Sequence, residues 1–301
     1  MFVPGLSMAC PSTSFGAPLK SSSKIRAFAL SACAIASSSP VSSLAQTPVG
    51  EVSGTAWQHT ASSLAATVAQ ADLVLPARAT GTSVWSGKFG NAPATKGERV
   101  PVVLFMHGSS GLGLKAIGEW QQWLATLGIA SLAPDSFALT GRVTYKSPIS
   151  VSQYEQIHAM RESEIAPSLL ALQSAAWADA GRIVLAGSSE GGVPVARFPG
   201  KAFAARMVFS WSCEANYFVA APRNAFEPDK PVLNVISQTD PFFSRSNTWL
   251  GNDAAQGHCG DALKSNPRAA VVLIPGAPHT LLNLPAARHA VAGFMAALAR
   301  P

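Results

Sequence analysis

The amino-acid sequence predicts an α/β fold with a mostly parallel central sheet and helices on both faces. Of its 301 residues, 48% are hydrophobic, which is enough for a large core, and 13% are charged, which is too few for a disordered chain. Apolar runs of strand length alternate with stretches of helical periodicity, and this alternation favours right-handed crossovers between parallel strands. No interdomain linker is evident, so we expect a single domain over residues 71–301.

The first half of this domain begins with a strand and a helix. Residues 102–106 (VVLFM) form a continuous apolar run of strand length. Residues 115–127 carry apolar side chains at spacings of three and four, which predicts one buried face of a helix. Next we expect a strand at 129–133, a loop at 134–150 and a helical stretch at 152–178, which Pro167 is expected to kink or divide.

The second half repeats this alternation. Short apolar runs again predict strands, and the segments between them carry helical patterns. In chain order we expect a strand at 182–186, a helix after Gly192, strands at 207–211 and 232–237, a short helix near 253–264, a strand at 270–274 and a helix at 285–300.

The first 45 residues predict a secretory signal peptide. They contain three basic residues and no acidic one, then an apolar run at 27–36, then a Ser/Pro-rich stretch that ends in Ser-Leu-Ala. We expect cleavage after Ala45, a polar segment at 46–70, and a periplasmic or secreted mature protein. The alternative is a lipoprotein processing box at 30–33 (LSAC), although the distance from Arg26 is short for that signal.

Charge and cysteine content limit the classes of partner. Without the leader, the remaining 256 residues carry 19 basic and 16 acidic side chains, a mild excess that does not predict a nucleic-acid partner. No run reaches the roughly 18 apolar residues of a membrane-spanning helix. Two cysteines remain, Cys213 and Cys259, and in an exported protein this pair predicts a disulfide. Two packed thiols are the alternative.

The strongest chemical signal lies between the strand at 182–186 and the helix that follows it. Residues 187–191 (GSSEG) fit the pattern G-x-S-x-G, which between a strand and a helix is typical of a nucleophile elbow. The sharp turn lifts Ser189 above the sheet in a strained backbone conformation, and the flanking glycines allow neighbouring backbone to approach. The alternative is an ordinary Gly/Ser loop.

A nucleophilic serine needs a base and a carboxylate that orients the base. Asp240 and His279 each follow the end of a predicted strand, at the edge where open α/β sheets collect their functional residues. We therefore predict a Ser-His-Asp triad. His258 is the rival for the base, and Glu214 is the rival for the acid.

Five stretches between 102 and 280 resemble those of a known superfamily: VVLFMHGSSGLG, GIASLAPDSF, RIVLAGSSEGG, VLNVISQTDPFF and VVLIPGAPHT. In their order and spacing they resemble α/β-hydrolases, and they are most similar to the dienelactone hydrolase-like branch. Dienelactone hydrolases have a cysteine at the elbow, so Ser189 favours a serine esterase instead. The resemblance implies an oxyanion hole made by the backbone amides of Glu190 and Ser109, with Ser110 as the alternative to Ser109.

The predicted function is hydrolysis of a small-molecule carboxylic ester or lactone through an acyl-enzyme on Ser189. The first alternative is a binding module with a hydrolase fold and no activity. The second is a nucleotide-binding oxidoreductase, because 111–116 (GLGLKA) fits G-x-G-x-x-A and Asp135 follows about 20 residues later. The oxidoreductase alternative is less favoured, because residues 107–110 separate the strand from the first glycine, where a nucleotide-binding motif needs a tight turn. No metal-ligand spacing is present, so neither metal nor cofactor is expected.

Two loops, at 134–150 and 241–260, are expected to shape the substrate pocket. Arg142 in the first loop is interpreted either as a partner for a substrate carboxylate or as a solvated side chain. Four aromatic residues near predicted strand ends are expected to line an acyl pocket or to belong to the core: Phe137, Trp211, Phe242 and Phe243.

Overall fold

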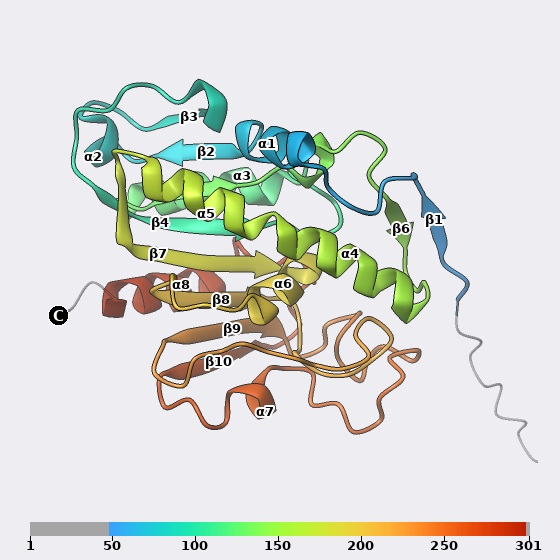
Figure 1. The fold of residues 1–301 in the computed structure, drawn as a ribbon. Helices are drawn as coiled ribbons and strands as arrows, with labels where there is room; N and C mark the ends of the chain where they lie inside the picture. The colour runs from blue at the N-terminus through green and yellow to red at the C-terminus, as the bar shows by residue number, and fades with distance from the viewer. Residues whose placement is uncertain (1–47, 299–301) are drawn as a thin grey trace, which may run out of the picture. The chain divides into compact units, whose positions relative to one another are not determined.

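A computed structural model describes residues 48–298 of the chain (Figure 1). The predicted signal peptide at 1–45 lies outside the described residues. The segment at 46–70, predicted only as polar, contains in its described part the short strand β1 (Glu51–Ser53) and the helix α1 (Ala61–Ala69). Strand β1 pairs with β6 (Thr144–Lys146), so this segment packs on the loop predicted at 134–150. None of the helices described is long and apolar enough to cross a membrane.

The described residues form an eight-stranded sheet in the order β10-β9-β8-β7-β4-β5-β2-β3. The six strands from β10 to β5 pair in parallel, while β2 and β3 form an antiparallel hairpin at one edge. The predicted mostly parallel sheet is therefore confirmed. The strands of the sheet are β2 (Asp72–Leu75), β3 (Trp85–Lys88), β4 (Val100–Met106), β5 (Ala130–Ala133), β7 (Ala178–Ser188), β8 (Ala205–Phe209), β9 (Val232–Ser237) and β10 (Ala269–Ile274).

Helices cover both faces of the sheet, and each face has its own apolar core. Along β4, alternate side chains enter the two cores: Val102, Leu104 and Met106 face one, and Val103 and Phe105 face the other. The first core is covered by α4 (Val151–Ser163), α5 (Ile165–Ser174) and α6 (Gly192–Arg197). The second core is covered by α3 (Lys115–Thr126) and α8 (Pro285–Leu298), which lie on the opposite side of the sheet in Figure 1.

The helical stretch predicted at 152–178 divides, but Pro167 is not the point of division. Helix α4 ends before Glu164, and α5 begins at Ile165, so Pro167 lies in the first turn of α5. A proline is tolerated there because the first-turn N–H groups of a helix have no partner within the helix. The predicted helix end at 178 is wrong, since Ala178 is the first residue of β7.

Other differences concern short elements. The hairpin of β2 and β3, with the short helix α2 (Ala77–Thr80) between its strands, was not predicted. Near 253–264 only one turn of helix forms, α7 (Gly260–Leu263). Each of these elements has only four residues, too few to show a clear hydrophobic period.

Cys213 and Cys259 form a disulfide, with their Cα atoms 4.8 Å apart. The bond joins the segment that follows β8 to the residue that precedes α7, across a sequence separation of 46 residues. The predicted pairing is confirmed. It ties together the two long connections that flank β9, the strand leading to Asp240.

Candidate active site

Ser189 lies at the sharp turn between β7 and α6. It opens a single 3-10 turn, Ser189–Gly191, and its φ of 54° lies in the left-handed region that non-glycine residues rarely adopt. Gly191 is packed so closely that a Cβ there would overlap the carbonyl oxygens of Met106 and His107. The turn therefore requires a small residue at this position, as the elbow pattern predicts.

Asp240 and His279 come from the segments after β9 and β10 and are joined by a hydrogen bond. Nδ1 of His279 lies 2.8 Å from Oδ2 of Asp240, whose side chain is fully buried. The other carboxylate oxygen accepts the backbone N–H groups of Phe242 and Phe243 at 2.9 and 3.1 Å. These contacts fix the carboxylate, so that Oδ2 is the atom presented to the imidazole.

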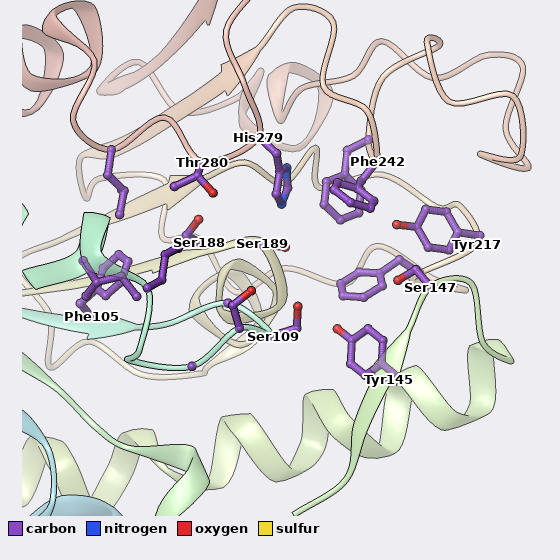
Figure 2. A pocket seen from close by; sticks show the side chains of 18 residues that line it. Phe105, Ser109, Tyr145, Ser147, Ser188, Ser189, Tyr217, Phe242, His279 and Thr280 are labelled. Atoms are coloured by element: carbon purple, nitrogen blue, oxygen red, sulfur yellow. The ribbon is translucent and has the colours of Figure 1, made fainter. Parts of the chain in front are cut away.

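Ser189 and His279 line the same pocket, which has a volume of about 150 Å³ (Figure 2). The structure thus brings the predicted nucleophile and base to one cavity, with the predicted acid directly behind the base. In the part of the chain described, no hydrogen bond joins the side chains of Ser189 and His279.

Two buried serines hold the loop that carries His279. The hydroxyl of Ser210, which follows β8 with a φ of 50°, donates to the carbonyl oxygen of His279 at 2.5 Å. The hydroxyl of Ser237, at the end of β9, donates to the carbonyl oxygen of Ala277 at 2.6 Å. The backbone of this loop is thereby attached to the ends of two neighbouring strands.

The predicted oxyanion residues lie beside the nucleophile. Ser109 and Ser110 follow β4 and line the pocket together with Ser189. Glu190 is the residue after the nucleophile, and its side chain is fully buried beneath the turn. Ser109 thus lines the pocket, and Glu190 directly follows a residue that lines it.

The side chain of Glu190 belongs to a buried ionic cluster that was not predicted. Its Oε1 accepts a hydrogen bond from Nη2 of Arg142 at 2.6 Å and lies 3.6 Å from Nε of Arg161. Arg161 also donates from Nη2 to the carbonyl oxygen of His107 at 3.0 Å. Both interpretations offered for Arg142 are wrong, because its side chain is buried and paired within the protein.

Glu164 completes this cluster with a second carboxylate. Its Oε2 lies 3.5 Å from Nη1 of Arg161, and its Oε1 accepts a hydrogen bond from Ser136 at 2.6 Å. Nε2 of His59, next to α1, lies 3.0 Å from the same Oε1. Two guanidinium groups thus face two carboxylates behind the nucleophile turn. Burial, reinforced by the charge of Arg161, holds the pKa of His107 well below its usual range, so this imidazole is neutral.

The rival residues have structural roles away from the pocket. Nδ1 of His258 accepts the backbone N–H of Gly260 at 3.0 Å. The carboxylate of Glu214 accepts backbone N–H groups of Gln256 and Gly257 at 2.6 and 3.0 Å. Asp135 accepts the N–H of Phe137 at 3.0 Å and caps a short 3-10 turn. None of these three side chains lines the pocket of Ser189.

The aromatic residues divide between pocket and other surroundings. Phe242 and Phe243 line the pocket, as predicted. Trp211 is fully buried in the core, and Phe137 is 38% exposed outside this pocket. The loop at 134–150, expected to shape the pocket, contributes Tyr145 to it, although this residue was not singled out. Tyr217 was missed, because it lies in neither of the loops expected to shape the pocket. Among residues 48–298, no group of three or more His, Cys, Asp or Glu side chains is arranged to hold a metal ion.

The strand order, the turn between β7 and α6, and the loops after β9 and β10 together give the α/β-hydrolase fold. No protein-family model matches the chain, and no curated protein matches it.

Solved structures do match, and three of them are similar to this chain at low sequence identity. One is the esterase PE8, 17% identical, with 69% of this chain and 96% of that chain covered and a TM-score of 0.49. Another is Est1E from Butyrivibrio proteoclasticus, 18% identical over 75% and 92% of the two chains, with a TM-score of 0.46. A third is a dienelactone hydrolase from Anabaena variabilis, 17% identical over 66% and 85%, with a TM-score of 0.42.

Proposed function

We propose that this protein is a serine hydrolase that cleaves carboxylic esters or lactones through an acyl-enzyme on Ser189. The observation that carries the proposal is a serine on a strained turn in the same pocket as His279, whose imidazole is hydrogen-bonded to the buried Asp240 at 2.8 Å. A serine hydroxyl becomes a nucleophile when a base can accept its proton and an acidic residue orients that base.

In the first half-reaction, Oγ of Ser189 attacks the carbonyl carbon while Nε2 of His279 accepts the hydroxyl proton. Asp240 holds the Nδ1–H tautomer and stabilises the imidazolium that forms. The backbone N–H groups of Ser109 and Glu190 donate to the developing oxyanion, and each such donor is typically worth about 3 kcal/mol of transition-state stabilisation. His279 then gives its proton to the departing alcohol.

In the second half-reaction, water replaces the alcohol. His279 accepts a proton from the water, which attacks the acyl carbon, and the bond to Ser189 breaks as the acid is released. Each proton taken from a nucleophile is returned to a leaving oxygen, so the cycle needs no cofactor. In a lactone the alcohol remains attached to the acid, and the same steps open the ring.

The test compares Ser189→Ala with the matched variant Ser188→Ala, since both serines line the pocket. The wild-type protein is expected to react with a fluorophosphonate probe and to hydrolyse p-nitrophenyl acetate. Ser189→Ala should lose both properties, while Ser188→Ala should keep the label. Equal activity of Ser189→Ala and wild type would reject the mechanism. Folded wild-type protein with neither labelling nor hydrolysis would favour the binding module.

We also propose that the protein is exported, with the mature chain starting after Ala45. The disulfide between Cys213 and Cys259 supports this, because such bonds persist mainly in oxidising compartments. Expression of the full chain in a Gram-negative host, followed by osmotic fractionation and N-terminal sequencing, tests the proposal. A periplasmic protein that begins at residue 46 is the expected result. An uncleaved cytoplasmic chain would contradict it.

A further inference from the structure

The pocket around Ser189 has two chemically different ends. One end is aliphatic and is lined by Leu114, Ile117 and Leu282, which belong to the same apolar cluster as Phe105. The other end, here called the aromatic end, is lined by Tyr145, Ser147, Tyr217, Phe218, Phe242 and Phe243. Figure 2 shows Ser189 and His279 between Phe105 on one side and the hydroxyl-bearing residues of the aromatic end on the other.

The rings of the aromatic end form a continuous wall that reaches the imidazole. The centroids of Phe242 and His279 lie 4.7 Å apart, and those of Phe218 and Phe243 lie 5.4 Å apart in an edge-to-face arrangement. Tyr217 stacks on Phe243 at 6.2 Å. A planar ring that enters beside His279 would extend this packing, because aromatic pairs gain energy from such offset and edge contacts.

The hydroxyl groups of the aromatic end have a defined direction of hydrogen bonding. The backbone N–H of Ile149 donates to Oη of Tyr154 at 3.2 Å, and Tyr154 in turn donates to Oγ of Ser147 at 2.8 Å. The proton of Ser147 is therefore directed away from Tyr154, to the pocket side, where its hydroxyl lies beside that of Tyr217 (Figure 2).

Both pocket phenols remain neutral, and the carboxylate of Glu190 is the acceptor for the proton of Tyr145. Burial raises the pKa of Tyr145 well above its usual range, and the neighbouring carboxylate of Glu190 raises it further. Burial also raises the pKa of Tyr217, with a smaller contribution from Asp240. Among the described residues, no lysine or arginine lines this pocket. Arg142, the cation that would suit a substrate carboxylate, is instead paired with Glu190.

We propose that the aromatic end binds an uncharged aryl group of the substrate, with an acceptor oxygen at the tip of the ring facing Ser147 and Tyr217, and that it rejects a carboxylate at that position. This inference rests on the proposed function. An ether or hydroxyl oxygen accepts hydrogen bonds from the hydroxyl donors. A substrate carboxylate would instead enter a site that holds no cation and lies near the buried carboxylates of Glu190 and Asp240.

The experiment measures kcat/KM for two series of esters, because the pocket extends on both sides of Ser189. The acyl series is methyl 3-phenylpropanoate with hydrogen, methoxy or carboxylate at the ring para position. The alcohol series is 2-phenylethyl acetate with the same three substituents. In one of the two series we expect methoxy to exceed hydrogen by about ten-fold, the effect of one good hydrogen bond. Carboxylate should fall below hydrogen by about 100-fold in that series.

Two variants link the preference to the hydroxyls. Tyr217→Phe and Ser147→Ala each remove one hydroxyl, and each should reduce the ratio of methoxy to hydrogen toward one, whatever the absolute rate of the variant. Thr280→Val is the matched control, because it removes a pocket hydroxyl outside the aromatic end and should keep the ratio whatever its absolute rate. Melting curves check that each variant is folded.

The outcomes separate this inference from the proposed function. If wild type hydrolyses p-nitrophenyl acetate but treats hydrogen, methoxy and carboxylate alike in both series, the inference is overturned and the proposed function stands. A methoxy preference that survives in both Tyr217→Phe and Ser147→Ala also overturns it. If wild type hydrolyses none of the esters, including p-nitrophenyl acetate, both proposals fail.

Discussion

Replacement of Glu190 by glutamine removes one negative charge from the buried ionic cluster and changes the shape of the side chain little. In the wild-type protein, Arg142 and Arg161 face the carboxylates of Glu190 and Glu164, so the two charges of each sign balance. The variant leaves two guanidinium groups against one carboxylate. Because the side chains of Arg142 and Glu190 are 1% and 0% exposed, water cannot compensate for the loss.

The expected loss of stability is large. Removing one partner of a buried ion pair typically costs about 3–5 kcal/mol. A chain of this size loses roughly 2–4 °C of melting temperature per kcal/mol, so Glu190→Gln should melt about 10 °C below wild type. The surface pair Arg78–Glu98 provides a matched control, because its side chains are 66% and 65% exposed. Glu98→Gln should cost at most about 1 kcal/mol.

Urea unfolding followed by tryptophan fluorescence gives the free energy of unfolding of each variant. A cycle that combines Glu190→Gln with Arg142→Met adds a second check, because removing both charges should cost less than the sum of the single losses. If Glu190→Gln loses no more stability than Glu98→Gln, the cluster does not behave as a buried network of charges and the reasoning is refuted.

Three further predictions concern pH, the base and the disulfide. Burial lowers the pKa of His158 from 6.5 to about 4, so between these pH values the unfolded chain binds a proton that the folded chain does not. The free energy of unfolding should therefore fall by about 3 kcal/mol as the pH is lowered from about 6.5 to 4. In urea titrations, His158→Leu should reduce this dependence of stability on pH. Ser210→Ala, which removes the hydrogen bond to the carbonyl of His279, should lower kcat for p-nitrophenyl acetate by about ten-fold at nearly constant KM, and an unchanged kcat would contradict a positioning role. Replacing both Cys213 and Cys259 by serine should cost about 4 kcal/mol, as expected for a loop of 46 residues, and a melting temperature equal to that of wild type would contradict this.

The parallel part of the sheet was predictable because its strands are continuous apolar runs. The strand predicted at 232–237 matches β9 at both ends, and the runs at 102–106 and 270–274 fall within β4 and β10. Strands buried on both faces, such as β4 and β9, consist mostly of apolar side chains, so their signal does not depend on knowing which strand is the neighbour.

Elements that depend on distant partners were harder to predict. The hairpin of β2 and β3 consists of four-residue strands, and β2 is held in the sheet by pairing with β5. Ala178 lies in an alanine-rich stretch that favours a helix locally, yet pairing with Val100 of β4 places it in a strand. Tertiary hydrogen bonds thus override local propensity at these positions.

The candidate site also contains residues whose positions were predictable from the sequence and residues whose positions were not. The Asp240–His279 pair was predictable because each residue lies in the loop after a strand, and strand ends converge at one edge of the sheet. The buried positions of Arg142 and Glu190 were not, because in a sequence an isolated charged residue usually indicates solvent exposure. Only the fold shows that Arg142, in the loop at 134–150, pairs with Glu190, in the turn that carries Ser189.

The tight contact of Gly191 with the backbone after β4 has a practical consequence for altering this protein. At the turn that carries Ser189, Gly191 touches the main chain of Met106 and His107, which leaves no space for an added methyl group. The pocket next to this turn is lined in part by side chains on long connections, among them Tyr145 and Tyr217. Libraries directed at these side chains should therefore yield folded proteins with new selectivity, whereas randomising Gly191 should yield mostly inactive or unfolded chains.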